Sequence, residues 1–355
     1  MKQDDASEFS SNRCTVSTLA EYQVPVRHPD LSFDDGNLAV LAGHNYFLVH
    51  KGVLCHHSPS LKQAIDELTN DSACPVLEGR PVLSIPYPPQ DVSCFLRVLY
   101  GLPVSLDGND FQITYALLTL STRYDITTLR AEVLRRLGMS WPRTLAQWEA
   151  REKKATNADG VYVPRPSLPH PNVIIALAEV INAPELLPSA FYDLSRYLPS
   201  QLVAPYTDPS TSAIYVLSAA NVYKVLKGKE QSARYFSTFI VNELEGRMPA
   251  KWCIYRNEAQ PSRKRNCQVA FETITLGILR DSNGLVLNLN SDPLFAIADS
   301  LLMQTRDDSP GTDNKSAFRA CEACRLEFGS VVQAAREEFW SKIPEWFDLT
   351  VENWT

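Results

Sequence analysis

The stretch FLVHKGVLCHHSPSL, residues 47–61, places three histidines, one cysteine and two serines within fifteen positions. His56 and His57 are adjacent, so on a helix their side chains point about 100° apart and cannot face one metal ion together. The spacing i, i+3, i+4, i+7 of a core-facing helix is occupied by His50, Val53, Leu54 and His57. His50 and His57 would lie roughly 10 Å apart along such a helix, too far to share a metal. The stretch therefore predicts packing rather than a metal or catalytic centre.

The residues around this stretch predict alternating strands and helices. Ser58 followed by Pro59 is typical of a helix N-cap and the first helical position. Residues 38–41 and 46–49 are predicted strands, and the turn residues between them indicate a β-hairpin. Residues 82–85 predict another strand, because the proline that follows them ends the pattern.

Helical signals dominate the rest of the chain. Asp91 is expected to cap a helix that stops at Gly101. Apolar residues at helical spacing predict a helical pair over 113–137, and further helices are expected over 172–202 and 217–247.

The composition is that of an ordinary globular protein. The chain has 355 residues, 45% hydrophobic and 21% charged, with a net charge of −7. The first residues, MKQDDASEFSSN, are acidic and polar, and no apolar run reaches the length of a membrane span. Nucleic acid is not expected as the main partner, because phosphate binding needs a basic surface. Eight cysteines without a secretory signal predict a reducing, intracellular compartment, either cytoplasm or nucleus.

The pattern divides the chain into five predicted segments. Residues 1–26 are expected to be a disordered arm, and 27–139 a compact domain that mixes strands and helices. Residues 140–171 are a linker candidate, since they contain a long polar run and then VPRPSLPHP with its four prolines. A helical region is expected over 172–250, followed by a cysteine-containing helical tail over 251–355.

Three stretches of the compact domain together resemble a BTB/POZ domain. They are GNLAVLAGHNYFLVHKGVLCHHSPSLKQAI at 36–65, VLSIPY with FLRVLYG at 82–101, and LLTLSTRYDITTLRAEVLRRL at 117–137. FDDGNLAVLAG at 33–43 and LLPSAFYDLSRY at 186–197 are similar to the BTB proteins that are numerous in mushroom-forming fungi. The resemblance implies an α+β fold, a small mixed sheet with helices over 27–139, followed by a mainly α-helical C-terminal region.

The resemblance also implies a role. In the BTB family this domain is an interaction module without catalysis of its own, and it self-associates, so a homodimer is expected. His50 would be a buried packing residue whose ring nitrogens are satisfied by neighbours. Many BTB dimers place an aspartate thirteen positions before this histidine, in a charged pocket with the basic residue after it. Here the two positions are Asn37 and Lys51, so the pocket lacks its usual acid.

The tail carries four cysteines that are candidates for one metal site. Cys321 and Cys324 have the C-x-x-C spacing that presents two thiolates to a tetrahedral ion. Cys253 and Cys267 flank a polar loop and could meet across a hairpin, which would complete a structural zinc site. Sulfur atoms around one zinc ion would lie roughly 3.5–4 Å apart. The alternatives are four unrelated cysteines, or a redox dithiol.

Two consequences are expected if the tail binds zinc. Loss of Cys321 should loosen the final helix around FWSKIPEWF, residues 339–347, because a bound metal contributes folding energy. The polar loop at 304–316 could move without unfolding the tail. A separate feature is the basic run Arg263-Lys264-Arg265, which is either a nuclear-import signal, a phosphate contact or a solvated loop tip.

The sequence as a whole predicts a non-enzymatic protein–protein interaction protein. One version is a substrate adaptor for a cullin ubiquitin ligase, and the alternative is a nuclear scaffold or transcriptional co-regulator. A zinc- or thiol-dependent enzyme built on the tail is the rival from another class. That enzyme would need an open position on its metal, whereas a site with four bound cysteines would be closed and structural.

Overall fold

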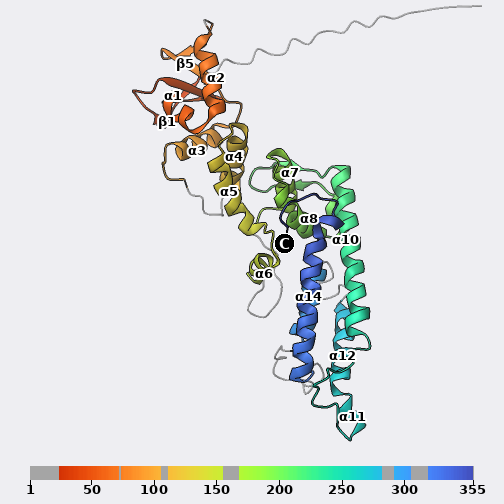
Figure 1. The fold of residues 1–355 in the computed structure, drawn as a ribbon. Coiled ribbons are helices and arrows are strands. Elements are labelled where there is room, and N and C mark those ends of the chain that lie inside the picture. Colours follow the sequence, from red (N-terminus) through yellow and green to blue (C-terminus); the bar gives the residue numbers. More distant parts are fainter. Residues whose placement is uncertain are drawn as a thin grey trace, which may run out of the picture. The chain divides into compact units, whose positions relative to one another are not determined.

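The computed structural model describes residues 24–71, 73–104, 111–154, 168–281, 292–304 and 319–354 (Figure 1). The chain divides into two compact units, residues 1–104 and 105–355. Nearly all of the predicted arm at 1–26, part of the predicted linker, and all but the first residue of the polar loop at 304–316 lie outside the described residues.

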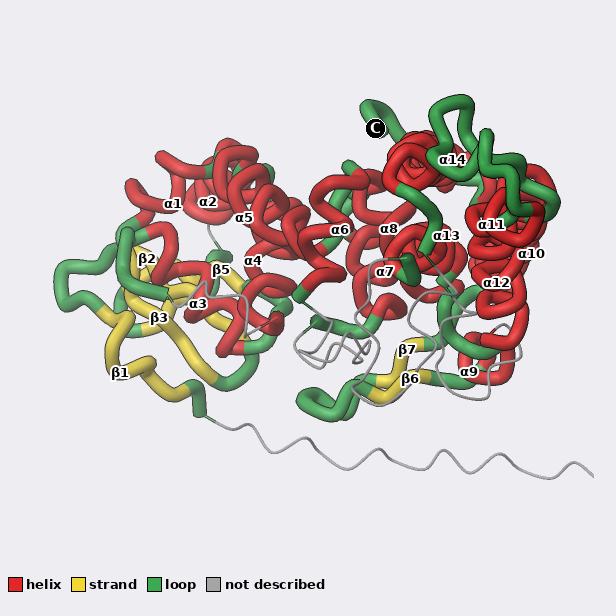
Figure 2. Tube along the Cα trace, turned by 90° about the horizontal axis from the view of Figure 1, so that it is seen from below, coloured by secondary structure: helices red, strands yellow, loops and turns green. Residues whose placement is uncertain are grey.

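The first unit is built on one five-stranded mixed sheet. Its strands run in the order β1-β3-β2-β5-β4, with bounds β1 Val26–Ser32, β2 Leu38–Ala42, β3 Asn45–Val49, β4 Val76–Leu77 and β5 Arg80–Ser84. The pairs β2–β3 and β4–β5 are antiparallel, whereas β1–β3 and β2–β5 are parallel. Figure 2 shows β1, β2, β3 and β5 gathered together, with α1 and α2 beside them.

The predicted hairpin is confirmed as β2 and β3. Leu38 pairs with Val49 and Ala42 with Asn45, so only two residues form the loop. The first of these, Gly43, has a φ of +54°, a conformation that suits glycine and makes the tight turn possible.

Three helices accompany the sheet: α1 Lys51–His57, α2 Pro59–Asn70 and α3 Pro89–Leu99. The predicted cap of α2 is confirmed, since Ser58 Oγ accepts a hydrogen bond from the Leu61 amide at 2.9 Å. The predicted cap of α3 is wrong. Asp91 lies inside the first turn, and the helix begins after Pro88, because two consecutive prolines already hold the backbone that enters the helix.

The first unit buries only part of the stripe predicted over residues 50–57. Leu54 is fully buried and packs in the core with Leu61, but His57 is exposed and His50 is half-buried. The prediction that His57 faces the core is wrong because α1 is short. The backbone is extended at Ser58, so α1 ends at His57 and the helical pattern does not continue far enough to bury this side chain.

The second unit is mainly helical, with one two-stranded hairpin. Its elements in chain order are α4 Phe111–Arg123, α5 Thr127–Ser140, α6 Leu145–Lys153, α7 Pro171–Val180, the 3₁₀ turn η1 Pro184–Leu186, α8 Leu187–Ser195, α9 Pro199–Val203, β6 Tyr206–Thr207, β7 Ile214–Tyr215, α10 Ala219–Phe239, the π-helical turn η2 Ile240–Leu244, α11 Pro261–Lys264, α12 Asn266–Asp281, α13 Pro293–Leu302 and α14 Glu322–Trp346. The predicted α+β class, a small mixed sheet followed by a mainly helical region, is thus confirmed.

The boundary between the units differs from the predicted segments in two places. The helices α4 and α5, expected within 27–139, belong to the second unit. Arg130 helps to join α5 to the second unit, because its guanidinium donates to the carbonyls of Ile181 and Asn182 at 3.0 and 3.2 Å. In addition, the stretch expected as a linker contains helix α6, which buries Trp148.

A long helix pair, α10 and α14, organises the second unit (Figure 1). Helix α10 also packs against α8, and α14 packs against α13. Gly228 in α10 lies so close to Phe347 that a Cβ placed there would be 2.2 Å from the ring. The glycine therefore permits the close approach of Phe347 to α10.

No helix among the described residues has both the length and the apolar character that a membrane crossing requires.

Candidate metal centre

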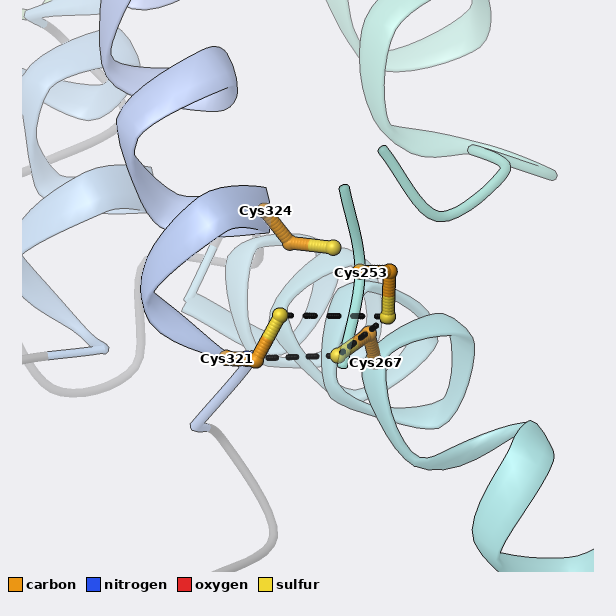
Figure 3. A group of neighbouring side chains, drawn as sticks. All are labelled: Cys253, Cys267, Cys321 and Cys324. Carbon is orange, nitrogen blue, oxygen red and sulfur yellow. Dashed lines mark hydrogen bonds between the residues drawn. The ribbon is translucent and has the colours of Figure 1, made fainter. Parts of the chain in front are cut away.

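Four cysteines of the second unit converge at one point, although they span 72 residues of sequence (Figure 3). Cys253 lies in the turns that follow η2, and Cys267 lies in the first turn of α12. Cys321 is the N-cap of α14, and Cys324 sits one turn further along the same helix. The prediction that all four come together is confirmed, but Cys253 and Cys267 meet across turns and a short helix rather than a hairpin.

The four sulfur atoms form a compact cluster. The Sγ atoms of Cys253 and Cys267 are 3.6 Å apart, and those of Cys253 and Cys321 are 3.8 Å apart. All four Sγ atoms lie within 4.8 Å of one another. None of the four cysteines forms a disulfide. The separations therefore resemble those of ligands around a shared centre rather than those of bonded sulfur pairs.

Backbone amides orient the sulfurs from both sides. The Ala250 amide donates to Sγ of Cys324 at 3.3 Å, and the Cys321 amide donates to Sγ of Cys267 at 3.2 Å. These hydrogen bonds join the turn after η2, the start of α12 and the start of α14. They also favour negative charge on the sulfurs, as ligands of a cation require.

The cluster is closed to solvent. The exposed fractions are 6% for Cys253, 0% for Cys267, 8% for Cys321 and 1% for Cys324. A cation held by these sulfurs would have four protein ligands and no side open to water, which is the pattern of a structural site.

The protein environment shifts the pKa values of the thiols in opposite directions. Burial alone would raise the pKa of Cys321, but amide donors from Cys324 and Ile254 outweigh it and lower that pKa to about 7. Its position at the N-terminus of α14 acts in the same direction, because the helix dipole favours a thiolate there. Burial raises the pKa of Cys267 to about 12 and also raises that of Cys324. Cys267 and Cys324 thus keep their protons unless a cation replaces them.

The donor set fits a tetrahedral metal ion. Zinc–sulfur bonds of about 2.3 Å place the sulfurs of a regular tetrahedron about 3.8 Å apart. The sulfur–sulfur separations of 3.6 and 3.8 Å around Cys253 match that value. All four sulfurs lie within 4.8 Å of one another, so a bound zinc ion would require only a small inward movement of the more distant ones. Four thiolates select zinc or iron among common metals, because these ligands are soft.

The other predicted site residues, Asn37, His50 and Lys51, lie in the first unit. Oδ1 of Asn37 accepts a hydrogen bond from the backbone amide of Lys51 at 2.8 Å. Asn37 thereby caps α1, whose own N-cap residue, His50, makes no such bond with its side chain. The contact that joins positions 37 and 51 is therefore a helix cap rather than a charge pair.

His50 has partners on both ring nitrogens, as predicted, although it is only half-buried. Nδ1 lies 3.0 Å from the hydroxyl of Tyr100, and Nε2 lies 3.2 Å from Oδ1 of Asp35. The Tyr100 hydroxyl also accepts the backbone amide of His50 at 2.7 Å. The ring is packed against Phe33 at 5.2 Å between centroids. His50 thus fixes the junction of β3 and α1, which is a structural role.

A buried ionic network in the second unit was not predicted from the sequence. Arg151 on α6 donates to Asp193 on α8 at 2.5 Å, and Arg196 donates to the same carboxylate at 3.2 Å. Arg196 also contacts Glu152 at 3.1 Å and Asp292 at 3.1 Å. The side chains in this network are between 5% and 14% exposed.

Aromatic rings complete the network. The guanidinium of Arg151 lies over the rings of both Trp141 and Trp148, 4.6 and 4.5 Å from their centroids. The hydroxyl of Tyr192 donates to Asp292 at 2.7 Å, and burial raises the pKa of Tyr192 well above its ordinary value. The network therefore ties α6 and α8 to the start of α13. The spacing of three in Asp193–Arg196 and in Trp148–Arg151 is a local signal, whereas partners 42 to 100 residues apart leave no pattern in sequence.

No family model matches this chain, and no curated protein matches it either. The function is therefore inferred from the residues and geometry described above, together with the sequence resemblance of residues 33–139.

Proposed function

We propose that this chain is a non-enzymatic protein–protein interaction protein whose helical unit is stabilised by one structural zinc ion. The observation that carries the proposal is the cluster of four buried thiols within 4.8 Å of one another. Cys253, Cys267, Cys321 and Cys324 would hold the ion. It would join the turn after η2, α12 and α14, three segments that are far apart in sequence.

The ligand set favours a structural role over catalysis. A catalytic zinc ion keeps a position for water or substrate, and its bound water supplies the chemistry. Here four cysteines fill the tetrahedral positions, and all four are buried. A zinc-dependent enzyme at this cluster would have to lose a ligand before it could bind substrate.

The first unit is proposed to act as a BTB-like domain for self-association and partner recruitment. The proposal is supported by its element order: a strand hairpin (β2, β3), a pair of helices (α1, α2), then β5 and α3. This order agrees with the pattern on which the sequence resemblance rests. Asn37 gives the unit a neutral residue where many BTB dimers carry an acid.

Two versions of this function remain as proposals. In the first, the BTB-like unit with the helices after it would hold a cullin, and the tail would select a substrate for ubiquitination. In the second, the protein would be a nuclear scaffold or transcriptional co-regulator, and the exposed basic run Arg263-Lys264-Arg265 is compatible with nuclear import.

Metal analysis of the full chain tests the zinc proposal. Protein purified without chelators should contain about one zinc ion per chain by mass spectrometry of its metals, and iron should be measured in the same sample. Chelation should lower the unfolding temperature, because a metal that binds only the folded state contributes folding energy. A folded, reduced protein with neither metal would contradict the proposal.

Two further measurements test the interaction role. Light scattering of the full chain should give twice the chain mass of 39.8 kDa at tens of micromolar, where stable interfaces persist. A tagged pull-down from the native source, identified by mass spectrometry, should recover cullin subunits under the adaptor version and nuclear regulators under the scaffold version. A monomer that recovers neither would count against the role.

A further inference from the structure

The turn that carries Cys253 exposes large apolar side chains at its surface. Trp252 is 78% exposed and Ile254 is 69% exposed, although the cysteine between them is 6% exposed. Met248, a few residues earlier, is 72% exposed. Single exposed apolar residues are common on protein surfaces, but three within seven positions form a concentrated apolar surface.

The same region is strongly basic. The exposed basic residues between positions 251 and 266 are Lys251, Arg256, Arg263, Lys264 and Arg265. The only acidic residue in this range is Glu258, so the local net charge is +4 in a chain whose net charge is −7. Arg265 forms an ion pair with Glu272 at 3.4 Å, whereas Arg263 and Lys264 have no carboxylate partner among the described residues.

The cysteine cluster brings these two features together. The Sγ atoms of Cys253 and Cys267 are 3.6 Å apart, so the apolar turn lies beside the segment that carries the basic run. Arg256 donates to the carbonyl of Lys251 at 3.4 Å, which folds the turn back on itself. Figure 1 shows α11, which contains Arg263 and Lys264, at the end of the helical unit distant from α7 and α8. Residues 248–256 and 263–265 are named the knuckle face below.

We propose that the knuckle face docks an acidic segment of a partner protein that also carries aromatic or aliphatic side chains. Its local charge of +4 complements carboxylates, and steers them to the surface at low ionic strength. Trp252 and Ile254 supply the apolar contact, since an exposed tryptophan is typical of residues that contribute most to binding.

A protein segment fits this surface better than a nucleic acid does. Nucleic-acid sites combine basic side chains with aromatic rings on which bases stack. Here aliphatic Ile254 and Met248 make up much of the exposed apolar surface, and they offer no stacking plane. The overall charge of −7 also repels a long polyanion, whereas a short acidic peptide meets mainly the local positive charge.

The inference rests on the proposed function, because the structural zinc ion would hold the turn and α12 in register. Metal bound by Cys253 and Cys267 would preorganise the knuckle face before the partner arrives, which reduces the ordering cost of binding. Cys253 is the one metal ligand within the knuckle face, and it is buried, so the exposed side chains of this face can be changed without removing a sulfur.

The test is a selection of displayed random 16-residue peptides on the full, zinc-analysed chain. Enriched peptides are synthesised with a fluorescent label, and their affinity is measured by fluorescence anisotropy. They should be acidic and contain at least one large apolar residue. The double variant Arg263→Glu with Lys264→Glu should weaken their binding by roughly tenfold or more, and raising the salt concentration should weaken it as well.

Matched variants separate a specific site from general effects. Trp252→Ala should also weaken binding roughly tenfold, as truncation of a central aromatic contact does. Tyr223→Ala, which removes an aromatic residue that is likewise exposed, should have no effect. Lys153→Glu with Lys154→Glu places the same charge change on two exposed lysines at the end of α6 and should also leave binding unchanged.

Three outcomes would overturn the inference: no enrichment, enrichment of peptides without acidic residues, or acidic peptides that bind all variants equally. Tighter binding of a labelled oligothymidylate than of any selected peptide would assign the surface to nucleic acid instead. Metal content is measured on each preparation. Failure of peptide binding in zinc-loaded protein would contradict only this inference, whereas a folded protein without metal would contradict the proposed function.

Discussion

The carboxylate of Asp193 lies 2.5 Å from Nη2 of Arg151, and each side chain is only 5% exposed. Asp193→Ala should therefore lower the free energy of unfolding by about 3–5 kcal/mol, because it removes from the buried guanidinium groups of Arg151 and Arg196 the carboxylate that they share. Urea unfolding of the full chain measures this change. Glu230→Ala, which breaks the exposed Glu230–Arg234 pair, should cost less than about 1 kcal/mol. A similar decrease in the free energy of unfolding for Asp193→Ala and Glu230→Ala would show that the buried network does not stabilise the second unit.

Gly228→Ala should destabilise the protein even though alanine is the better helix former. The new Cβ would lie 2.2 Å from the Phe347 ring, so Phe347 or α10 would have to move. Overpacking of this kind costs about 1–3 kcal/mol, which exceeds the gain of about 1 kcal/mol in helix propensity. The transition midpoint in thermal unfolding should fall accordingly.

Gly138→Ala is the matched control, since a Cβ at that helical position meets nothing within 4 Å. This variant should be neutral or gain up to about 1 kcal/mol. If both variants were stabilised alike, the close approach of Phe347 to Gly228 would not be a real constraint.

Cys321→Ser should abolish zinc binding and loosen α14 from its N-terminal end. The helix has 25 residues, so its two ends lie about 36 Å apart. Hydrogen exchange should therefore increase first near Cys324, while residues 339–347 keep the protection that buried Phe339 and Trp340 give them. This revises the expectation that loosening would centre on FWSKIPEWF.

Cys55→Ser is the control for the cysteine variant, because Cys55 lies in the first unit and outside the cluster. It should leave metal content and exchange in α14 unchanged. Increased exchange that is uniform along α14 would argue that the cluster has no local role in holding the helix.

His170 should make the stability depend on pH. Burial lowers its pKa from 6.5 to about 4, and its Nδ1 accepts the Asn172 amide as the cap of α7. Between those pH values the unfolded chain binds more protons than the folded one. The contribution of His170 to the free energy of unfolding is therefore complete above pH 6.5 and decreases as the pH falls toward 4. The loss is about 1–2 kcal/mol after allowance for the partial exposure of the ring.

His170→Asn isolates this contribution, since asparagine caps a helix without titrating near neutral pH. Urea unfolding at pH 7.0, 5.5 and 4.5 should show the difference between the parent and the variant growing toward acid. A constant difference across the three pH values would assign the acid sensitivity to other groups.

Local features could be predicted from sequence because their causes are local. The β2–β3 hairpin follows from two apolar runs around a two-residue glycine turn, and the Ser58 cap follows from its position before Pro59. The convergence of the four cysteines was predictable in part, since Cys321 and Cys324 have a spacing that few other roles explain.

Features that depend on distant partners could not be predicted. Arg151 and Arg196 look like surface residues in sequence, because Asp193, which pairs with Arg151, and Asp292, which pairs with Arg196, are distant from them along the chain. His57 was assigned to the core because periodicity does not indicate that α1 ends there. Helix α6 was missed because polar residues hide its few buried positions, Trp148 among them.

The cap that Asn37 provides to α1 also bears on how this protein can diverge. Aspartate at position 37 would accept the Lys51 amide as well as asparagine does, and the two amino acids have codons that differ by one base. One mutational step can thus change the charge at this position while the helix keeps its cap. Proteins with asparagine or aspartate at position 37 would have the same fold, so selection on the charge at this position can act independently of selection on stability.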